Sequence, residues 1–158
     1  MIKRRINWKI LVISFLIVFT VAFVGSLFTS TNTDTAWYDS IKPEITPPNW
    51  VFPIVWNVLF VLIALSLYFS WANSKNKKDK EKIILAFGIN FILNIFWSVL
   101  YFTLKNPFVA LLEIFVLWSS IMFMIYVTYG ISKKAAYLLV PCLLWVSFAT
   151  ILNYLTVF

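Results

Sequence analysis

The sequence has no histidine, a single cysteine, three glycines and only six acidic residues among 158. Without histidine, and with its carboxylates scattered, the chain is not expected to hold zinc or haem, so no metal site and no cofactor is predicted. Cys142 is alone and cannot form an intramolecular disulfide. No motif supplies an activated nucleophile, which excludes ordinary covalent catalysis.

Apolar residues make up 62% of the sequence and charged residues only 12%. With so few polar residues, a water-soluble globular protein of this size could not cover its surface, so an integral membrane protein is predicted. The net charge of +7 comes from basic residues in short clusters between apolar runs. Membrane lipid headgroups are the natural partner of such clusters, and nucleic-acid binding is not expected.

Five apolar runs predict an all-α bundle of five transmembrane helices in one domain, residues 1–158. A helix rises about 1.5 Å per residue, so roughly 20 apolar residues cross the hydrocarbon of a bilayer. The first run follows several basic residues and could be a cleaved signal peptide. We favour a retained helix, because the run exceeds a signal core and no clear small-residue cleavage site follows. The predicted helices are approximately 10–28, 50–71, 83–104, 107–129 and 135–157.

Lysine and arginine alternate between the flanks of these helices. The amino-terminal tail (Lys3, Arg4, Arg5, Lys9), the second loop and the fourth loop hold eleven, whereas the first and third loops hold only Lys42 and Lys105. Positive residues concentrate on the cytoplasmic side, so the amino terminus is predicted to be cytoplasmic.

The long first loop, residues 29–49, is predicted to cap the bundle. It carries Trp37 and Tyr38, followed by Pro43, Pro47 and Pro48, which fix backbone angles. A plainer interpretation is that the two aromatic residues lie in the interfacial aromatic belt of the membrane. The residues of the loop leave both interpretations open.

Two asparagines and two tryptophans predict an intramembrane pocket. Asn90 and Asn94 lie four apart on one helix face, and amides must face inward in hydrocarbon. For Asn90, a hydrogen bond between helices and a contact with a ligand are equally good interpretations. Trp56 and Trp145 lie deeper in their helices than interfacial anchors do, where indoles can stack on a flat apolar ligand. Glu113, the only carboxylate within a span, is interpreted as a local structural or pocket-rim group.

Three phrases of the sequence resemble one known family. They are Trp37-Tyr38 with Lys42-Pro43 and Thr46-Pro47-Pro48; the asparagine pair; and a run from Pro141 to Thr150 that reads Pro-x-x-x-Trp-x-x-Phe-Ala-Thr. Together they resemble the translocator protein family, also called tryptophan-rich sensory proteins, over roughly residues 10–154. The chain departs from the family in the cap, where Ile45 stands in place of the second loop tryptophan of many members and the stretch from Trp37 to Lys42 is one residue shorter.

The resemblance implies a membrane receptor or transport-type protein that binds porphyrins and similar flat hydrophobic molecules. An alternative from the same family is a light- and oxygen-dependent porphyrin-degrading enzyme, for which Trp56 and Trp145 are the catalytic candidates. The family also implies a homodimer, and the expected location is the cell (inner) membrane of a prokaryote. The expected ligand-binding residues are Trp37, Tyr38, Thr46, Pro47, Trp56, Asn90, Asn94, Trp97, Trp145 and Ala149.

The family's sterol motif is incomplete in this chain. An apolar residue and a tyrosine are present at Leu152 and Tyr154, but no basic residue follows before Phe158. Sterol binding through that motif is therefore not expected.

The charge pattern makes a testable prediction about sidedness. Cysteines introduced at Ser74 and at Ser40 should react with a membrane-impermeant thiol reagent from opposite sides of sealed vesicles, because the two residues lie in consecutive loops. Reaction of both from the same side would contradict the predicted topology.

Overall fold

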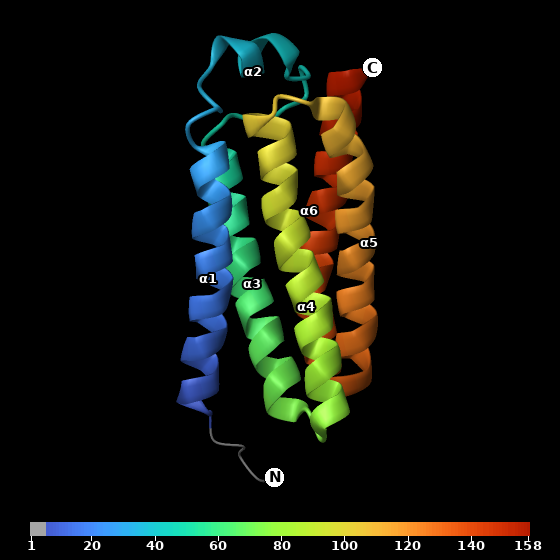
Figure 1. The fold of residues 1–158 in the computed structure, drawn as a ribbon. Coiled ribbons are helices and arrows are strands. Elements are labelled where there is room, and N and C mark those ends of the chain that lie inside the picture. The colour runs from blue at the N-terminus through green and yellow to red at the C-terminus, as the bar shows by residue number, and fades with distance from the viewer. Residues whose placement is uncertain (1–5) are drawn as a thin grey trace.

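The computed structural model describes residues 6–158, and within them the regular secondary structure is entirely helical. Lys3, Arg4 and Arg5, which contribute to the predicted orientation, lie outside the described residues. Figure 1 shows a bundle of long helices with a short helix across one end. The helices are α1 (Trp8–Thr29), α2 (Ala36–Ile41), α3 (Val51–Asn73), α4 (Lys77–Ser98) with a π-helical turn η1 (Val99–Thr103), α5 (Pro107–Ile131) and α6 (Lys133–Val157).

Most of these helices begin at a residue whose side chain caps the first turn. Such a cap matters because the first backbone N–H groups of a helix have no partner within it. The cap oxygen accepts a hydrogen bond from the N–H three residues on, for the pairs Asn7–Ile10, Thr35–Tyr38, Asn76–Asp79, Asn106–Val109 and Ser132–Ala135. The helix α3 has no side-chain cap and instead follows Pro47-Pro48.

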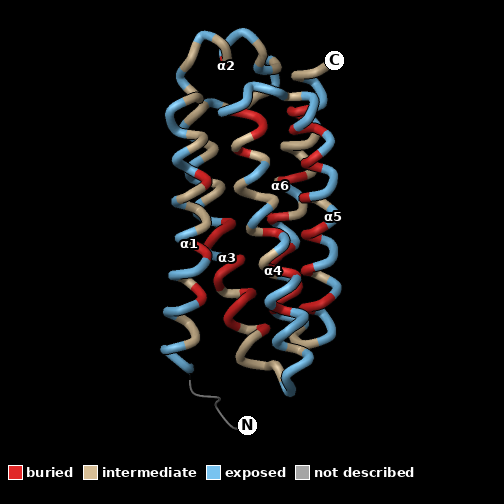
Figure 2. Tube along the Cα trace, in the orientation of Figure 1, coloured by how far each residue is buried: buried red, intermediate tan, exposed pale blue. Residues whose placement is uncertain are grey.

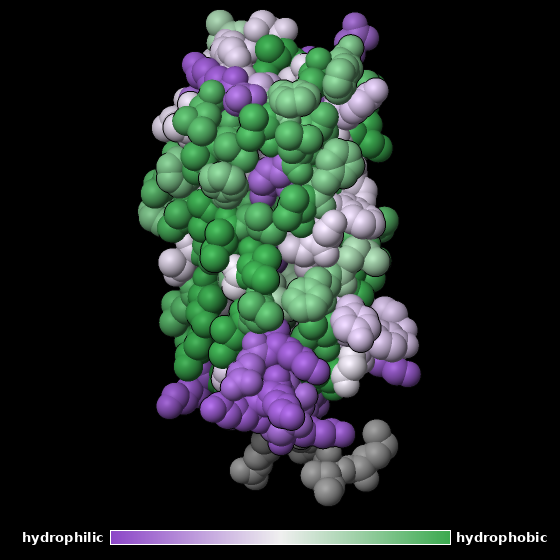
Figure 3. Space-filling view, turned by 45° about the vertical axis from the view of Figure 1, so that its right-hand side comes forward, coloured by the Kyte–Doolittle hydropathy of each residue, from purple (hydrophilic) through white to green (hydrophobic). Residues whose placement is uncertain are grey.

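Within residues 6–158, five helices are long and apolar enough to cross a membrane, which confirms the predicted number. Their spans are Trp8–Thr29, Val51–Asn73, Lys77–Thr103, Pro107–Ile131 and Lys133–Val157. Figure 3 shows a mostly hydrophobic flank and a strongly hydrophilic end where α3 meets α4. Apolar side chains that face outward along a helix are solvated by lipid, so the molecule is a multi-pass membrane protein.

The five long helices form a ring. Going round it, α1 packs against α3, α3 against α6, α6 against α5, α5 against α4, and α4 against α1. The buried core contains Val18, Ile63, Phe87, Ile121 and Leu139, one from each helix. Figure 2 shows the buried positions concentrated on the inner faces of α3 to α6, with α1 the most exposed of the five.

Polar side chains tie neighbouring helices together inside the ring. Ser66 Oγ donates to the carbonyl of Ala135 at 2.8 Å and joins α3 to α6. Trp118 Nε1 donates to Ser147 Oγ at 2.8 Å and joins α5 to α6. Hydrogen bonds between membrane helices typically contribute about 1 kcal/mol each, and they also fix the rotation of one helix against its neighbour.

The first loop folds over the end of the ring and contains a helix that the sequence analysis did not assign. This helix, α2, lies across the bundle end in Figure 1. The two ends of the loop are tied together, because Asn49 Nδ2 donates to the carbonyl of Thr33 at 3.2 Å and to Asp34 Oδ1 at 3.0 Å. The side chain of Thr35 caps the first turn of α2, and this cap stabilises a helix that is only six residues long.

The cap-side end of α4 widens into a π-helical turn. Leu104 N donates to the carbonyl of Val99 at 2.9 Å, a bond that spans five residues rather than four. Single π turns in α-helices change the direction of the side chains that follow, and they are frequent at functional sites. Here the turn carries Tyr101 and Phe102, whose rings contact the first loop.

Candidate functional site

A cavity of about 700 Å³ occupies the cap-side half of the ring. All five long helices and the first loop contribute to its wall. This volume lies within the range of about 300 to 1,000 Å³ that small-molecule sites span. The aromatic residues of the wall are Phe19, Phe23, Tyr38, Trp50, Phe52, Trp56, Phe60, Trp97, Tyr101, Phe102 and Trp145.

The indoles of three helices are held by neighbouring rings. Trp56 of α3 lies 5.4 Å from Phe60 at an interplanar angle of 30°. Trp145 of α6 meets the edge of Phe52 at 5.8 Å and 69°. Such pairs fix ring orientation, because aromatic quadrupoles favour offset or edge-to-face contact. The wall therefore presents flat apolar surfaces in set positions.

Trp97 of α4 is the most firmly held of these indoles. Its Nε1 donates to Asn153 Oδ1 at 3.2 Å, and Asn153 Nδ2 in turn donates to the carbonyl of Pro107 at 2.9 Å. The Trp97 ring also stacks on Tyr101 at 5.0 Å. Asn153 was not among the predicted site residues, although an amide inside an apolar run is a signal that the sequence does contain.

The two predicted asparagines of α4 have different surroundings. Asn90 is 3% exposed and donates to Ser120 Oγ at 2.9 Å, which ties α4 to α5 outside the cavity. Asn94 is half-buried and lines the cavity. Of the two interpretations left open for Asn90, its contacts match a hydrogen bond between helices. Asn94 is the amide placed where it can meet a ligand.

The first loop contributes only some of its predicted residues to the wall. Tyr38 and Thr46 line the cavity, and so does Pro43, which was not predicted; Trp37 and Pro47 do not line it. The Trp37 ring instead meets the edge of Tyr101 at 6.2 Å, under Lys105 Nζ at 5.6 Å. Trp37 thus lies behind the wall, where it supports a ring that forms part of it.

Tyr38 closes the cavity from the cap side. Its side chain is 6% exposed, and its ring lies 5.8 Å from Phe102. Burial raises the pKa of Tyr38 to about 12, with smaller contributions from the charges of Tyr101 and Asp39. A buried phenol resists ionisation because the phenolate would lose its hydration.

The α1 side of the wall combines the rings of Phe19 and Phe23 with three small residues. Ala22, Gly25 and Ser26 line the cavity. Trp56, Trp145 and Ala149, predicted from α3 and α6, line it as well. The small side chains of α1 therefore share the cavity wall with the aromatic rings of α3 and α6.

The acidic residues offer no metal ligands in this region. Within residues 6–158 no group of three or more His, Cys, Asp or Glu side chains is placed to hold a metal ion. Glu113 is buried on α5 but does not line the cavity, and neither of its carboxylate oxygens has a hydrogen-bond partner among the described residues.

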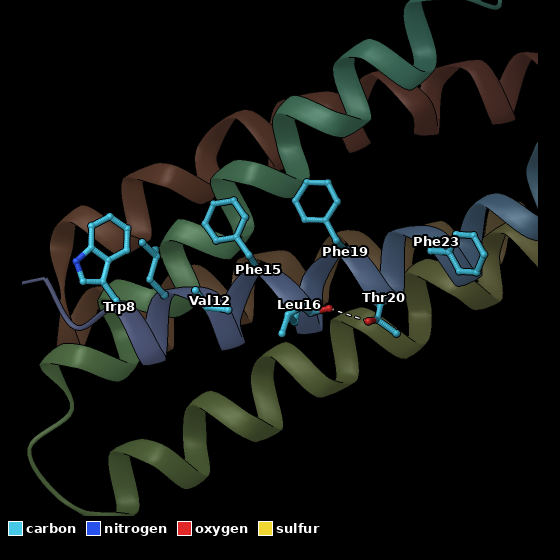
Figure 4. Close-up of a pocket in the computed structure, with 8 residues that line it drawn as sticks. Trp8, Val12, Phe15, Leu16, Phe19, Thr20 and Phe23 are labelled. Atoms are coloured by element: carbon cyan, nitrogen blue, oxygen red, sulfur yellow. Dashed lines mark hydrogen bonds between the residues drawn. The ribbon is translucent and has the colours of Figure 1, made fainter.

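A second, shallower hollow runs along the outer face of α1 (Figure 4). It is lined by Trp8, Leu11, Val12, Phe15, Leu16, Phe19, Thr20 and Phe23. The rings of Phe15 and Phe19 stack at 6.1 Å with an angle of 8° between their planes. Thr20 Oγ1 donates to the carbonyl of Leu16 at 2.7 Å, so the polar atom at this surface is satisfied. We call this hollow the α1 groove.

These features define the chain as a five-helix membrane protein with an aromatic cavity under a folded loop. Residues 14–158 match the TspO/MBR family, and the chain belongs to that family. It is 39% identical to the tryptophan-rich protein TspO of Archaeoglobus fulgidus over 91% of this chain and 92% of the relative. It is 36% identical to the protein of the same name from Chlorobaculum tepidum, over 85% of each chain. The human translocator protein is 30% identical over 84% of this chain and 79% of its own.

The two asparagines make a matched pair for a test. Asn90→Ala should lower the unfolding temperature in detergent, because it removes the hydrogen bond that joins α4 to Ser120 of α5, at a cost of about 1 kcal/mol. Asn94→Ala should leave the unfolding temperature nearly unchanged and alter the affinity for a cavity ligand. Thermal unfolding and ligand titration of both variants check this, and the opposite assignment of effects would contradict it.

Tyr38 makes a prediction about alkaline pH. The pKa of Tyr38 is 10.0 in the unfolded chain and about 12 in the folded one. The folded state therefore binds more protons than the unfolded state between these two pH values. The contribution of Tyr38 to stability is therefore complete below pH 10.0 and is lost as pH rises toward about 12. Tyr38→Phe should lose less stability over this interval than the unmodified protein. Equal losses in thermal unfolding would contradict the assignment.

Proposed function

We propose that this protein is a membrane receptor or transport-type protein that binds porphyrins and similar flat hydrophobic ligands in the aromatic cavity. The observation that carries the proposal is the combination of Trp56, Trp97 and Trp145 around one cavity of about 700 Å³. Rings held at fixed angles can stack on a flat apolar molecule without first reorganising, which favours binding. Asn94 supplies an amide that can orient a polar edge of the ligand.

The same proposal includes the arrangement in the membrane. Among the described residues, Lys9, Lys75 to Lys82 and Lys133-Lys134 belong to one end of the bundle, and Lys42 and Lys105 to the cap end. We place the first end in the cytoplasm, with lipid headgroups as its partners, in the cell membrane of a prokaryote. A homodimer is proposed from the family resemblance alone.

The indoles also favour a second candidate function, the light- and oxygen-dependent breakdown of a bound porphyrin. Indole rings are readily oxidised, and Trp56 and Trp145 would lie beside the excited ring system. Since the residues of the wall offer no nucleophile with an activating base, the photochemistry would belong to the porphyrin, while the protein holds it and supplies oxidisable side chains.

Titration with protoporphyrin IX in the dark, followed by tryptophan quenching, tests the binding proposal. Trp145→Ala should weaken binding by about 1 kcal/mol, or about fivefold, because one aromatic contact is lost. Trp71→Phe is the matched control, since Trp71 lies at the other end of α3 and does not line the cavity. Unchanged affinity in both Trp56→Ala and Trp145→Ala would refute the site.

Illumination of the same samples separates the two candidate functions. If the protein degrades porphyrin, a new absorbing product should form only with oxygen, and its yield should fall in the Trp56→Phe/Trp145→Phe double variant. Equal bleaching of porphyrin in detergent alone would leave binding as the function.

A further inference from the structure

The exposed part of the cavity wall lies on one side of the ring. The lining residues from α4, η1, α5 and α6 are all buried or half-buried. Those exposed at the surface come from α1, from the loop that follows it, or from the start of α3: Phe23, Ser26, Ser30, Asp34, Trp50, Pro53 and Asn57. Phe23 is 64% exposed. The cavity is therefore open between the cap-side halves of α1 and α3.

We call this gap the side opening and define it by Phe23 and Ser26 on α1 and by Pro53 and Asn57 on α3. Asn57 lies six residues into α3, about 9 Å along the helix axis from Val51, which places it within the span. An exposed amide at that depth is costly in pure hydrocarbon, and such residues usually face a cavity or a water-accessible space. Asn57 Nδ2 and Ser26 Oγ each donate to a carbonyl of their own helix at 2.7 Å, which lowers the cost of an apolar molecule passing them.

Empty space continues inward from the side opening at Gly25. This residue is buried, yet a Cβ atom added to it would meet no other atom within 4 Å. A buried position with nothing in front of it faces a void, and Gly25 is part of the cavity wall. The small residues of α1 thus leave a passage between the side opening and the aromatic interior.

The α1 groove approaches the side opening from the outer surface of the bundle. The groove and the cavity share Phe19 and Phe23 in their walls. In Figure 4 the groove residues follow α1 from Trp8 to Phe23, with Phe15 and Phe19 pointing toward α3. The α1 groove, on the lipid-facing side of α1, therefore adjoins the side opening at Phe23.

The cap covers the route along the bundle axis. Tyr38 is packed against Phe102, and Lys42 Nζ lies 5.8 Å from the centre of the Tyr38 ring. The hydrogen bonds from Asn49 to Thr33 and Asp34 hold the loop closed on itself. A ligand arriving along the bundle axis would have to displace these contacts, whereas one arriving through the side opening would not.

We infer that hydrophobic ligands reach the cavity sideways from the bilayer, along the α1 groove and through the side opening, while the cap stays closed. This inference rests on the proposed binding function. It also fits the chemistry of the proposed ligands, since a flat apolar molecule partitions into lipid and need not leave hydrocarbon to reach the aromatic wall.

The test is the rate at which protoporphyrin IX binds to the protein in lipid nanodiscs, followed by the fluorescence of the porphyrin. Ser26→Trp should narrow the side opening and slow both association and dissociation by about tenfold, equivalent to about 1.4 kcal/mol of added barrier. Because Ser26 also lines the cavity, a loss of affinity alone would speed dissociation, whereas a narrowed opening slows it. Leu27→Trp is the matched control, because Leu27 is 54% exposed on the same helix and lines neither the cavity nor the α1 groove.

Two further variants test the side opening and the closed cap separately. Asn57→Phe narrows the opening from α3 and should slow both rates even if Ser26→Trp fails to fold. Trp37→Cys with Lys105→Cys, joined by a short thiol crosslinker, locks the cap onto the bundle, because Lys105 Nζ lies over the Trp37 ring. Its association rate should be the same before and after cross-linking.

The outcomes separate the two proposals. If the unmodified protein binds no porphyrin, the proposed function fails and the inference falls with it. If it binds normally but Ser26→Trp and Asn57→Phe leave both rates unchanged, only the side opening is refuted. Slower association after cross-linking of the cap would also overturn the inference, because it would show that the ligand passes beneath α2.

Discussion

The need to satisfy polar groups inside hydrocarbon governs this structure more than any other constraint. A bilayer offers no water to an amide or indole N–H, so a partner within the protein stabilises such a group. Trp145 Nε1 is an exception, because it is buried without a hydrogen-bond partner among the described residues. Asn90 meets this requirement through Ser120, and Asn153 meets it by bridging Trp97 and the carbonyl of Pro107. These bonds set the rotation of α4 against α5 and α6. The position of the Trp97 indole in the cavity wall follows from that rotation.

The cavity exists because the ring of helices is packed unevenly along its length. In the half that carries the α3–α4 turn, residues such as Ile63, Phe87 and Leu139 fill the interior. In the cap-side half, large aromatic rings on α3, α4 and α6 line one cavity with the small residues Ala22 and Gly25 of α1. Rings are rigid and cannot collapse into the space that small residues leave, so a void persists. The cap then covers the void at one end.

Both local chemistry and tertiary contacts determine the structure of the first loop. Thr35 caps α2 through its own side chain, and the prolines restrict the backbone beyond it. The placement of that helix depends on distant partners, since Tyr38 packs on Phe102 and Trp37 on Tyr101. The π-helical turn that aims these two rings arises where α4 meets the loop and α5. No periodicity in the sequence marks such a turn.

The sequence by itself determined the class of the protein, the number of membrane helices and their order, because hydrocarbon thickness dictates a run length that can be counted directly. It also indicated Trp56, Asn94 and Trp145 as candidates, since polar and aromatic residues deep in a span are costly and therefore informative. Only the tertiary structure decided which amide joins helices and which lines the cavity, because Asn90 and Asn94 share one helix face and the packed helices alone bring Ser120 within reach of Asn90. It alone also placed Gly25 at a void, since the absence of a side chain has no meaning until the surrounding helices are in position.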